Sequence, residues 1–193
     1  MTDTELLYLH DAYLRHFSAT VVDVRVADDG SEAAVTLDRT AFYATGGGQP
    51  HDAGTLAGIP VVNVRTERGS DGALVWHTLD GDPPDVGATV EGVIDWDRRH
   101  QLMRTHTALH ILCGVIWNEW GVSVTGGNME PLKARMDFEF DPLPDGFAER
   151  ITELVNAEIE ADRPIEVSFL PRAEALADDD LIRTKVNLIP ESV

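Results

Sequence analysis

The sequence has a single cysteine, Cys113, among its 193 residues. One thiol excludes an internal disulfide framework and is typical of a reducing compartment, so we expect a cytoplasmic protein. No apolar run approaches the roughly 18 residues that a membrane-spanning helix needs. The first five residues have neither the basic nor the apolar region of a signal peptide. These absences predict a protein that has no membrane as a partner, and the sequence indicates no obligate protein partner either.

Basic residues are also scarce, because 15 Lys and Arg face 34 Asp and Glu and the formal net charge is -19. The lysines are Lys133 and Lys185 alone. Contacts with phosphate dominate affinity for nucleic acids, so this balance ordinarily argues against RNA or DNA as a partner. We interpret the acidity as adaptation to a halophilic cytoplasm, where salt screens self-repulsion. Any RNA-binding face must then be a local cluster of arginines.

The spacing of apolar residues changes near residue 93 and divides the chain into two halves. Before it, period-two alternation between clusters of turn residues predicts short strands and a small β-barrel or sandwich. After it, apolar residues at helical spacing predict a long helix that Gly121 ends, followed by strands and a second helix that ends before Pro164. The expected strands span residues 20–26, 33–37, 59–65, 73–79, 88–95, 122–125, 133–140 and 165–170, and the expected helices span 97–120 and 146–162.

The predicted fold class is therefore α+β. We expect an N-terminal small β-barrel domain over residues 1–92. Residues 93–193 are expected to form an α+β domain with helices packed on an antiparallel sheet.

His106 and His110 are four residues apart, which places both imidazoles on one face of the long helix. Either the pair binds one metal ion, or the two are ordinary hydrogen-bonded helix residues; the spacing alone leaves both open. Thr107 stands where a metalloprotease has its glutamate, so that enzyme class is excluded. Cys113 lies about 10 Å from His106 along the helix axis and is predicted to belong to the core. A zinc ion takes three or four protein ligands, so the site is incomplete.

The segment FYATGGGQPHDAG, residues 42–54, contains three successive glycines. Glycines permit backbone conformations closed to other residues and let a ligand or an RNA backbone approach closely. No Gly-Lys-Ser/Thr follows, and no strand-turn-helix unit surrounds the segment, so neither a P-loop nor a dinucleotide fingerprint is present. A tight connection between barrel strands is the alternative.

FYATGGGQPHDAG, followed some fifty residues later by RTHTALHIL, closely resembles the AlaX family, free-standing relatives of the editing domain of alanyl-tRNA synthetase. The resemblance extends through VTGGNMEPLKARMDFEF to essentially the whole chain. It implies hydrolysis of the ester between tRNA(Ala) and a wrongly attached amino acid, typically serine. Whether Gly-tRNA(Ala) is a substrate as well is left open by the sequence. The implied cofactor is one Zn²⁺, held by the HxxxH pair and by a later CxxxH motif.

Carried over by matching position, His106 and His110 are the first two zinc ligands. Gly46, Gly47 and Gly48 form the family's glycine-rich loop. Thr107 and Gln49 are the predicted catalytic residues, and Thr107 is expected to contact the serine hydroxyl, since alanine would leave that contact unmade. The candidates for binding tRNA are Arg98, Arg99, Arg104 and Arg135, although arginines of an acidic protein can equally be ion-paired.

Two departures from the family stand out. The sequence reaches Val193 without a CxxxH motif, which indicates either a piece of a longer protein, the explanation we favour, or loss of full metal binding. Thr125-Gly126-Gly127 also stands where synthetase editing domains often have a glutamine. The competing hypotheses are a tRNA-binding relic without a complete zinc site and a zinc hydrolase of small esters or amides.

Overall fold

The computed structural model describes residues 3–30, 32–69 and 72–177. Along the chain the elements are β1 (Glu5–Leu6), the 3-10 helix η1 (Leu7–Leu9), β2 (His16–Val26), β3 (Ala33–Leu37), β4 (Arg39–Thr40), β5 (Gly54–Leu56), β6 (Ile59–Gly69), β7 (Gly72–Leu79), β8 (Thr89–Ile94), α1 (Trp96–Trp120), β9 (Val124–Glu130), β10 (Lys133–Phe138), α2 (Phe147–Glu160) and α3 (Arg172–Leu176). The described strand pairs are antiparallel except for the parallel pair of β1 and β4. The predicted α+β class is confirmed.

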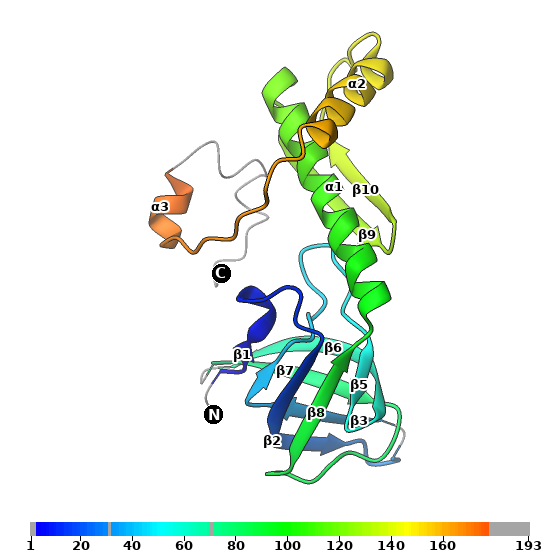
Figure 1. Ribbon diagram of the computed structural model, residues 1–193, viewed down its shortest axis with the longest axis vertical. Helices are drawn as coiled ribbons and strands as arrows, with labels where there is room; N and C mark the ends of the chain where they lie inside the picture. Colours follow the sequence, from blue (N-terminus) through cyan, green and yellow to red (C-terminus); the bar gives the residue numbers. More distant parts are fainter. Residues whose placement is uncertain (1–2, 31, 70–71, 178–193) are drawn as a thin grey trace. The chain divides into compact units, whose positions relative to one another are not determined.

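Six strands of the first half pair in the closed order β2-β3-β7-β6-β5-β8 (Figure 1). The pairing of β2 with β8 completes the ring, with His16 opposite Val93 and Thr20 opposite Thr89. A closed ring of strands leaves no row of unpaired backbone groups along an edge.

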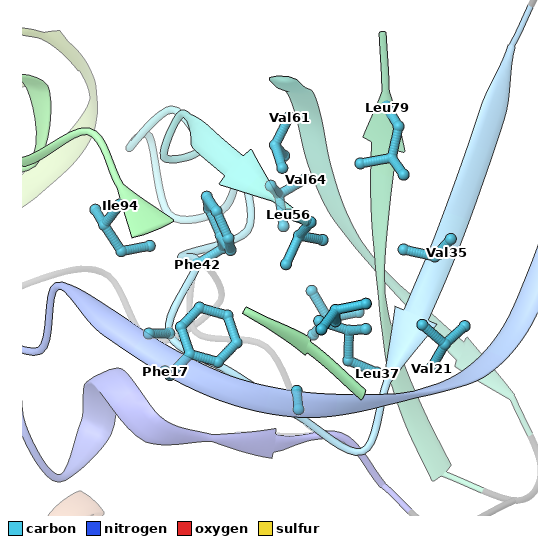
Figure 2. Packing of buried hydrophobic residues seen from close by; sticks show 14 of the residues in the cluster. Phe17, Val21, Val35, Leu37, Phe42, Leu56, Val61, Val64, Leu79 and Ile94 are labelled. Atoms are coloured by element: carbon cyan, nitrogen blue, oxygen red, sulfur yellow. The ribbon is translucent and has the colours of Figure 1, made fainter. Parts of the chain in front are cut away.

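Inward-pointing side chains fill the space between these strands (Figure 2). Strand β8 shows how the sequence produces this arrangement, since its residues are alternately exposed and buried and Val90 and Ile94 point into the core. Gly92, between them, leaves room for Phe17, because a Cβ atom there would lie 2.2 Å from the Phe17 ring. Period-two alternation thus places one face of the strand in the core.

Helix α1 has a signal at each end. The Asp95 carboxylate accepts a hydrogen bond from the Arg98 N–H at 3.1 Å, an N-cap interaction. At the other end, Gly121 has φ 66° and its N–H donates to the Trp117 carbonyl at 2.8 Å, which confirms the predicted stop. Within the described ranges, no helix is both long and apolar enough to cross a bilayer.

The second half contains a hairpin and two further helices. Strands β9 and β10 pair antiparallel around the turn after Glu130. Trp120, Phe140 and Phe147 form an aromatic cluster with ring centroids 5.1–5.9 Å apart. An ion pair of 2.8 Å between Arg150 and Glu119 also joins α2 to the end of α1. These contacts fix α2 against the last turn of α1.

The structure differs from the sequence prediction at several elements. It contains β1, β4, β5 and α3, which the sequence did not predict, and β2 begins at His16, before the predicted residue 20. Residues 165–170 form no strand, because their alternating apolar residues have no partner strand among the described residues and stay exposed, as at Val167 (74%). The strand expected over 122–125 begins at Val124 and extends to Glu130, through Gly126 and Gly127. The structure divides into two compact units between Met103 and Arg104, inside α1.

His77 is a fully buried histidine of β7 with both ring nitrogens in hydrogen bonds. Its Nδ1–H donates to the Val35 carbonyl at 3.3 Å, so Nε2 accepts from the Thr40 hydroxyl, which is 2.8 Å away. Burial lowers the pKa of His77 to about 4. The ring is therefore held neutral, and the unfolded chain binds a proton there at a higher pH than the folded chain.

This lowered pKa predicts a loss of stability as the pH falls from about 6.5 towards about 4. Between pH 7 and pH 5 the His77 contribution to the free energy of unfolding should fall by about 2 kcal/mol, because only the unfolded state gains the proton. Urea unfolding at both pH values would measure it. The His77→Gln variant serves as the reference, and an equal pH dependence in both proteins would contradict the prediction.

Candidate functional site

Gly46, Gly47, Gly48 and Gln49 form a tight turn. Gly46 and Gln49 exchange two backbone hydrogen bonds of 3.1 and 2.9 Å. The two residues between them have positive φ, 58° at Gly47 and 80° at Gly48, as in a type I′ turn. Both central glycines are exposed, so the turn presents its backbone to solvent.

Two side-chain hydrogen bonds stabilise this turn and the residues that flank it. The Tyr43 hydroxyl donates to the Gly46 carbonyl at 3.1 Å, and the Thr45 hydroxyl accepts from the His51 N–H at 3.1 Å. Burial raises the pKa of Tyr43 and raises that of its neighbour Tyr8 to about 12, so both phenols keep their protons at neutral pH. Tyr43 therefore donates to the turn in its protonated form.

Arg99, one of the arginines predicted to bind tRNA, is buried and does not lie at the surface. Its side chain is 4% exposed and forms an ion pair with Asp52, which is 1% exposed. The guanidinium also donates to the backbone carbonyls of Ala41 and Ala12. All three guanidinium nitrogens of Arg99 therefore donate to other groups of the protein.

Arg98 is half-buried and donates from Nε and one terminal nitrogen to the His51 carbonyl, at 3.3 and 3.1 Å. The segment that carries the turn is therefore bound by two successive arginines of α1. Sequence reasoning identified both arginines but missed Asp52, the carboxylate that pairs with Arg99. The available signal was a carboxylate inside an otherwise apolar and glycine-rich segment. The sequence did not show that this carboxylate pairs with an arginine 47 residues away.

His106 and His110 lie stacked on one face of α1. Their ring centroids are 4.8 Å apart and their planes differ by 14°. Two nitrogens bound to one tetrahedral zinc ion stand about 3.3 Å apart, a separation that rings at this spacing can reach. Partial burial lowers the pKa of both histidines, and the proximity of His110 lowers that of His106 further. Both rings therefore favour the neutral form, which is the form that binds metals.

The donor type suits zinc, but the number of donors is short. Within residues 3–30, 32–69 and 72–177, no group of three or more His, Cys, Asp or Glu side chains is arranged to hold a metal ion. Cys113 is partly buried on the same side of α1, one turn beyond His110. Thr107 is also partly buried, about 100° around the helix from His106.

An open hollow of about 320 Å³ lies on a different face of α1. It is lined by Arg104, Thr105, Ala108, Leu109, Leu112, Leu132 and Ala134. The Thr105 hydroxyl accepts from the Leu132 N–H at 2.9 Å, which holds the hairpin turn against the helix. Neither histidine of the pair lines this hollow, so the structure does not bring them together with Arg104.

The remaining predicted residues lie on the hairpin or beside it. Arg104 is exposed. Arg135 is exposed too and forms an ion pair of 3.2 Å with Asp137. Thr125 and Gly126 belong to β9, where the Thr125 hydroxyl donates to the Asp137 carbonyl at 3.2 Å. Thr125 therefore contributes to the pairing of the hairpin.

Comparison with known protein families first assigns the class. The family model of class II (A) tRNA synthetases matches residues 5–98. Among individual proteins, the chain is 38% identical over 177 residues to the alanyl-tRNA editing protein AlaX-M of Saccharolobus solfataricus, covering 90% of this chain and 71% of that protein. It is 39% identical over 188 residues to AlaX-M of Methanosarcina acetivorans, covering 89% of this chain and 71% of that protein.

An alanine–tRNA ligase of Pyrobaculum neutrophilum is 36% identical over 194 residues, which cover 97% of this chain and 21% of the ligase. The resemblance to AlaX seen in the sequence is thus confirmed. The chain belongs to the AlaX family of alanyl-tRNA editing proteins.

The glycine turn generates a paired prediction. Gly47→Ala should lower the free energy of unfolding by about 1 kcal/mol, because φ 58° is strained for a residue with a side chain. Gly46→Ala should change it by less than about 0.5 kcal/mol, because an added Cβ would meet its nearest atoms at 3.9 Å and φ is not in the left-handed region. Urea denaturation of the two variants tests this. Equal destabilisation would contradict the assigned turn.

Proposed function

We propose that the protein is a trans-editing hydrolase that removes a wrongly attached amino acid from tRNA(Ala), serine first and glycine second. The observation that carries the proposal is the coexistence of two features in a chain related to alanyl-tRNA editing proteins: the Gly46–Gln49 turn and the stacked pair His106 and His110. The proposed partner is mischarged tRNA(Ala).

His106 and His110 are the residues that would hold Zn²⁺. Support comes from their 4.8 Å ring separation and from the lowered pKa of both imidazoles. When bound, the ion would polarise the ester carbonyl and lower the pKa of a water molecule. An aminoacyl ester is already activated, so the chain must chiefly orient it and exclude the correct alanyl ester.

Thr107 is proposed to make that exclusion. Thr107 directly follows His106 in α1, and a serine side chain could hydrogen-bond with its hydroxyl, whereas an alanine side chain could not. A buried polar group left without its partner costs free energy, so the serine ester is preferred. Gln49 is proposed as the second substrate contact, because it closes the turn whose tip is exposed.

For tRNA binding, the structure favours Arg104 and Arg135 over the other predicted arginines. Arg104 and Arg135 are both exposed. The ion pair described for Arg135 is with Asp137, whose side chain is itself 44% exposed. Exposed ion pairs contribute little and are readily exchanged for a phosphate.

The zinc proposal is tested with the full chain and two matched variants. The wild type should bind about one Zn²⁺ per chain and deacylate Ser-tRNA(Ala). His106→Ala should lose the metal and slow deacylation by more than about 100-fold, since even loss of a ligand's supporting residue commonly costs 10- to 100-fold. His100→Ala, an exposed histidine of the same helix, is the control and should behave as wild type. Metal content by mass spectrometry and release of labelled serine are the measurements.

The outcome also separates the competing functions. A wild-type chain that binds tRNA(Ala) but neither binds zinc nor hydrolyses the ester would be a binding module. This alternative is favoured by the fact that the described residues include only two candidate zinc ligands close together, His106 and His110. Equal turnover of Ser-tRNA(Ala) and free seryl esters would instead indicate a small-ester hydrolase and would end the editing proposal.

Thr107→Val provides a test of specificity. Valine keeps the shape of threonine but removes the hydroxyl, so the ratio of kcat/KM for Ser-tRNA(Ala) over Ala-tRNA(Ala) should fall about tenfold, the value of one hydrogen bond. Metal content should stay at the wild-type level. An unchanged ratio would show that another residue recognises serine.

A further inference from the structure

Arg99 reaches three separate segments of the barrel unit from the first turn of α1. Its Nε donates to one oxygen of Asp52 at 2.8 Å, and a terminal nitrogen donates to the other oxygen and to the Ala41 carbonyl. The second terminal nitrogen donates to the Ala12 carbonyl at 3.1 Å. The bonds to Asp52 and Ala41 are buried, since Arg99 is 4% and Asp52 1% exposed, whereas the bond to Ala12 is only partly buried.

Asp52 links the Arg99 side chain to the segment that carries the glycine turn. Its carboxylate accepts from the Tyr43 N–H at 2.6 Å, and its own N–H donates to the Tyr43 carbonyl at 3.0 Å. Asp52 and Tyr43 therefore close the base of the loop whose tip is Gly47 and Gly48. The Tyr43 hydroxyl then holds the turn itself through Gly46.

The chemistry of the two partners explains why an arginine is needed. A guanidinium is planar and offers five N–H donors in a fixed fork, so it can bind a carboxylate through two parallel bonds and still donate to carbonyls on either side. An ammonium at the same position is a compact charge and cannot span all three acceptors. The loop base is thus rigid, whereas the turn at its tip is exposed.

We propose that Arg99 is a positioning residue of the editing reaction: by holding Asp52 it fixes the Gly46–Gln49 turn in the conformation that meets the aminoacyl end of the tRNA. The proposal rests on the proposed function. It also assigns Arg99 a role different from a phosphate contact, and the two roles differ in their dependence on salt.

The experiment compares Arg99→Lys with wild type, using Asp52→Asn as the second variant and Arg25→Gln as the control. Arg25 belongs to the same unit but forms an exposed ion pair with Glu67. In Arg99→Lys, hydrogen exchange at the amides of Gly46 and Gln49 should accelerate at least tenfold, while exchange at Val35 and His77 in the β3–β7 ladder stays unchanged. Arg25→Gln should alter neither set. Asp52→Asn should reproduce the Arg99→Lys pattern and decides the matter if the lysine variant does not fold.

Kinetics with Ser-tRNA(Ala) supply the functional half. Arg99→Lys should reduce kcat at least tenfold, leave KM within twofold, and leave the slope of log affinity against log salt unchanged. A slope reduced by about one would indicate a lost phosphate contact and overturn the proposal. Uniformly faster exchange throughout the barrel, or unchanged turn exchange in a folded variant, would overturn it as well. If the wild type deacylates no mischarged tRNA, the proposed function fails, while the exchange data still decide whether Arg99 holds the turn.

Discussion

The buried ion pair of Arg99 and Asp52 connects the first turn of α1 with the base of the glycine turn. Removing two charges from water is costly, and such a pair persists only where further hydrogen bonds satisfy both groups. Here the Ala41 and Ala12 carbonyls satisfy the guanidinium and the Tyr43 N–H satisfies the carboxylate. Loss of one partner from a buried pair typically costs about 3–5 kcal/mol, so the loop and the helix start are held as one piece.

The two halves of α1 serve different purposes. Its first turn is bound into the barrel unit through the Arg99 pair, whereas its later turns carry different chemistry on different faces. Thr105 holds the β9–β10 hairpin through Leu132, and the stacked histidines His106 and His110 lie on another face. A helix can separate these tasks because successive residues are displaced by about 100° around its axis.

Much of the fold follows from local patterns in the sequence. The alternation in β8, the helical spacing between Trp96 and Trp120 and the stop at Gly121 each have a local physical cause, and each prediction is confirmed within a residue or two. The segment 165–170 has the same alternation as β8 but forms no strand in the described structure. Strand formation needs a hydrogen-bonding neighbour, and period-two alternation alone does not supply one.

The sequence by itself determined the family, the α+β class and the presence of the glycine turn and the histidine pair, because short motifs and periodicities are local properties. Only the tertiary structure decided which arginines are available to a ligand. Arg98 and Arg99 are adjacent, and the sequence does not distinguish them. In the structure Arg98 is half-buried and bonded to the His51 carbonyl, whereas Arg99 is buried and paired with Asp52. The reason is that burial and pairing depend on residues 47 positions away, which only the folded barrel brings next to the helix.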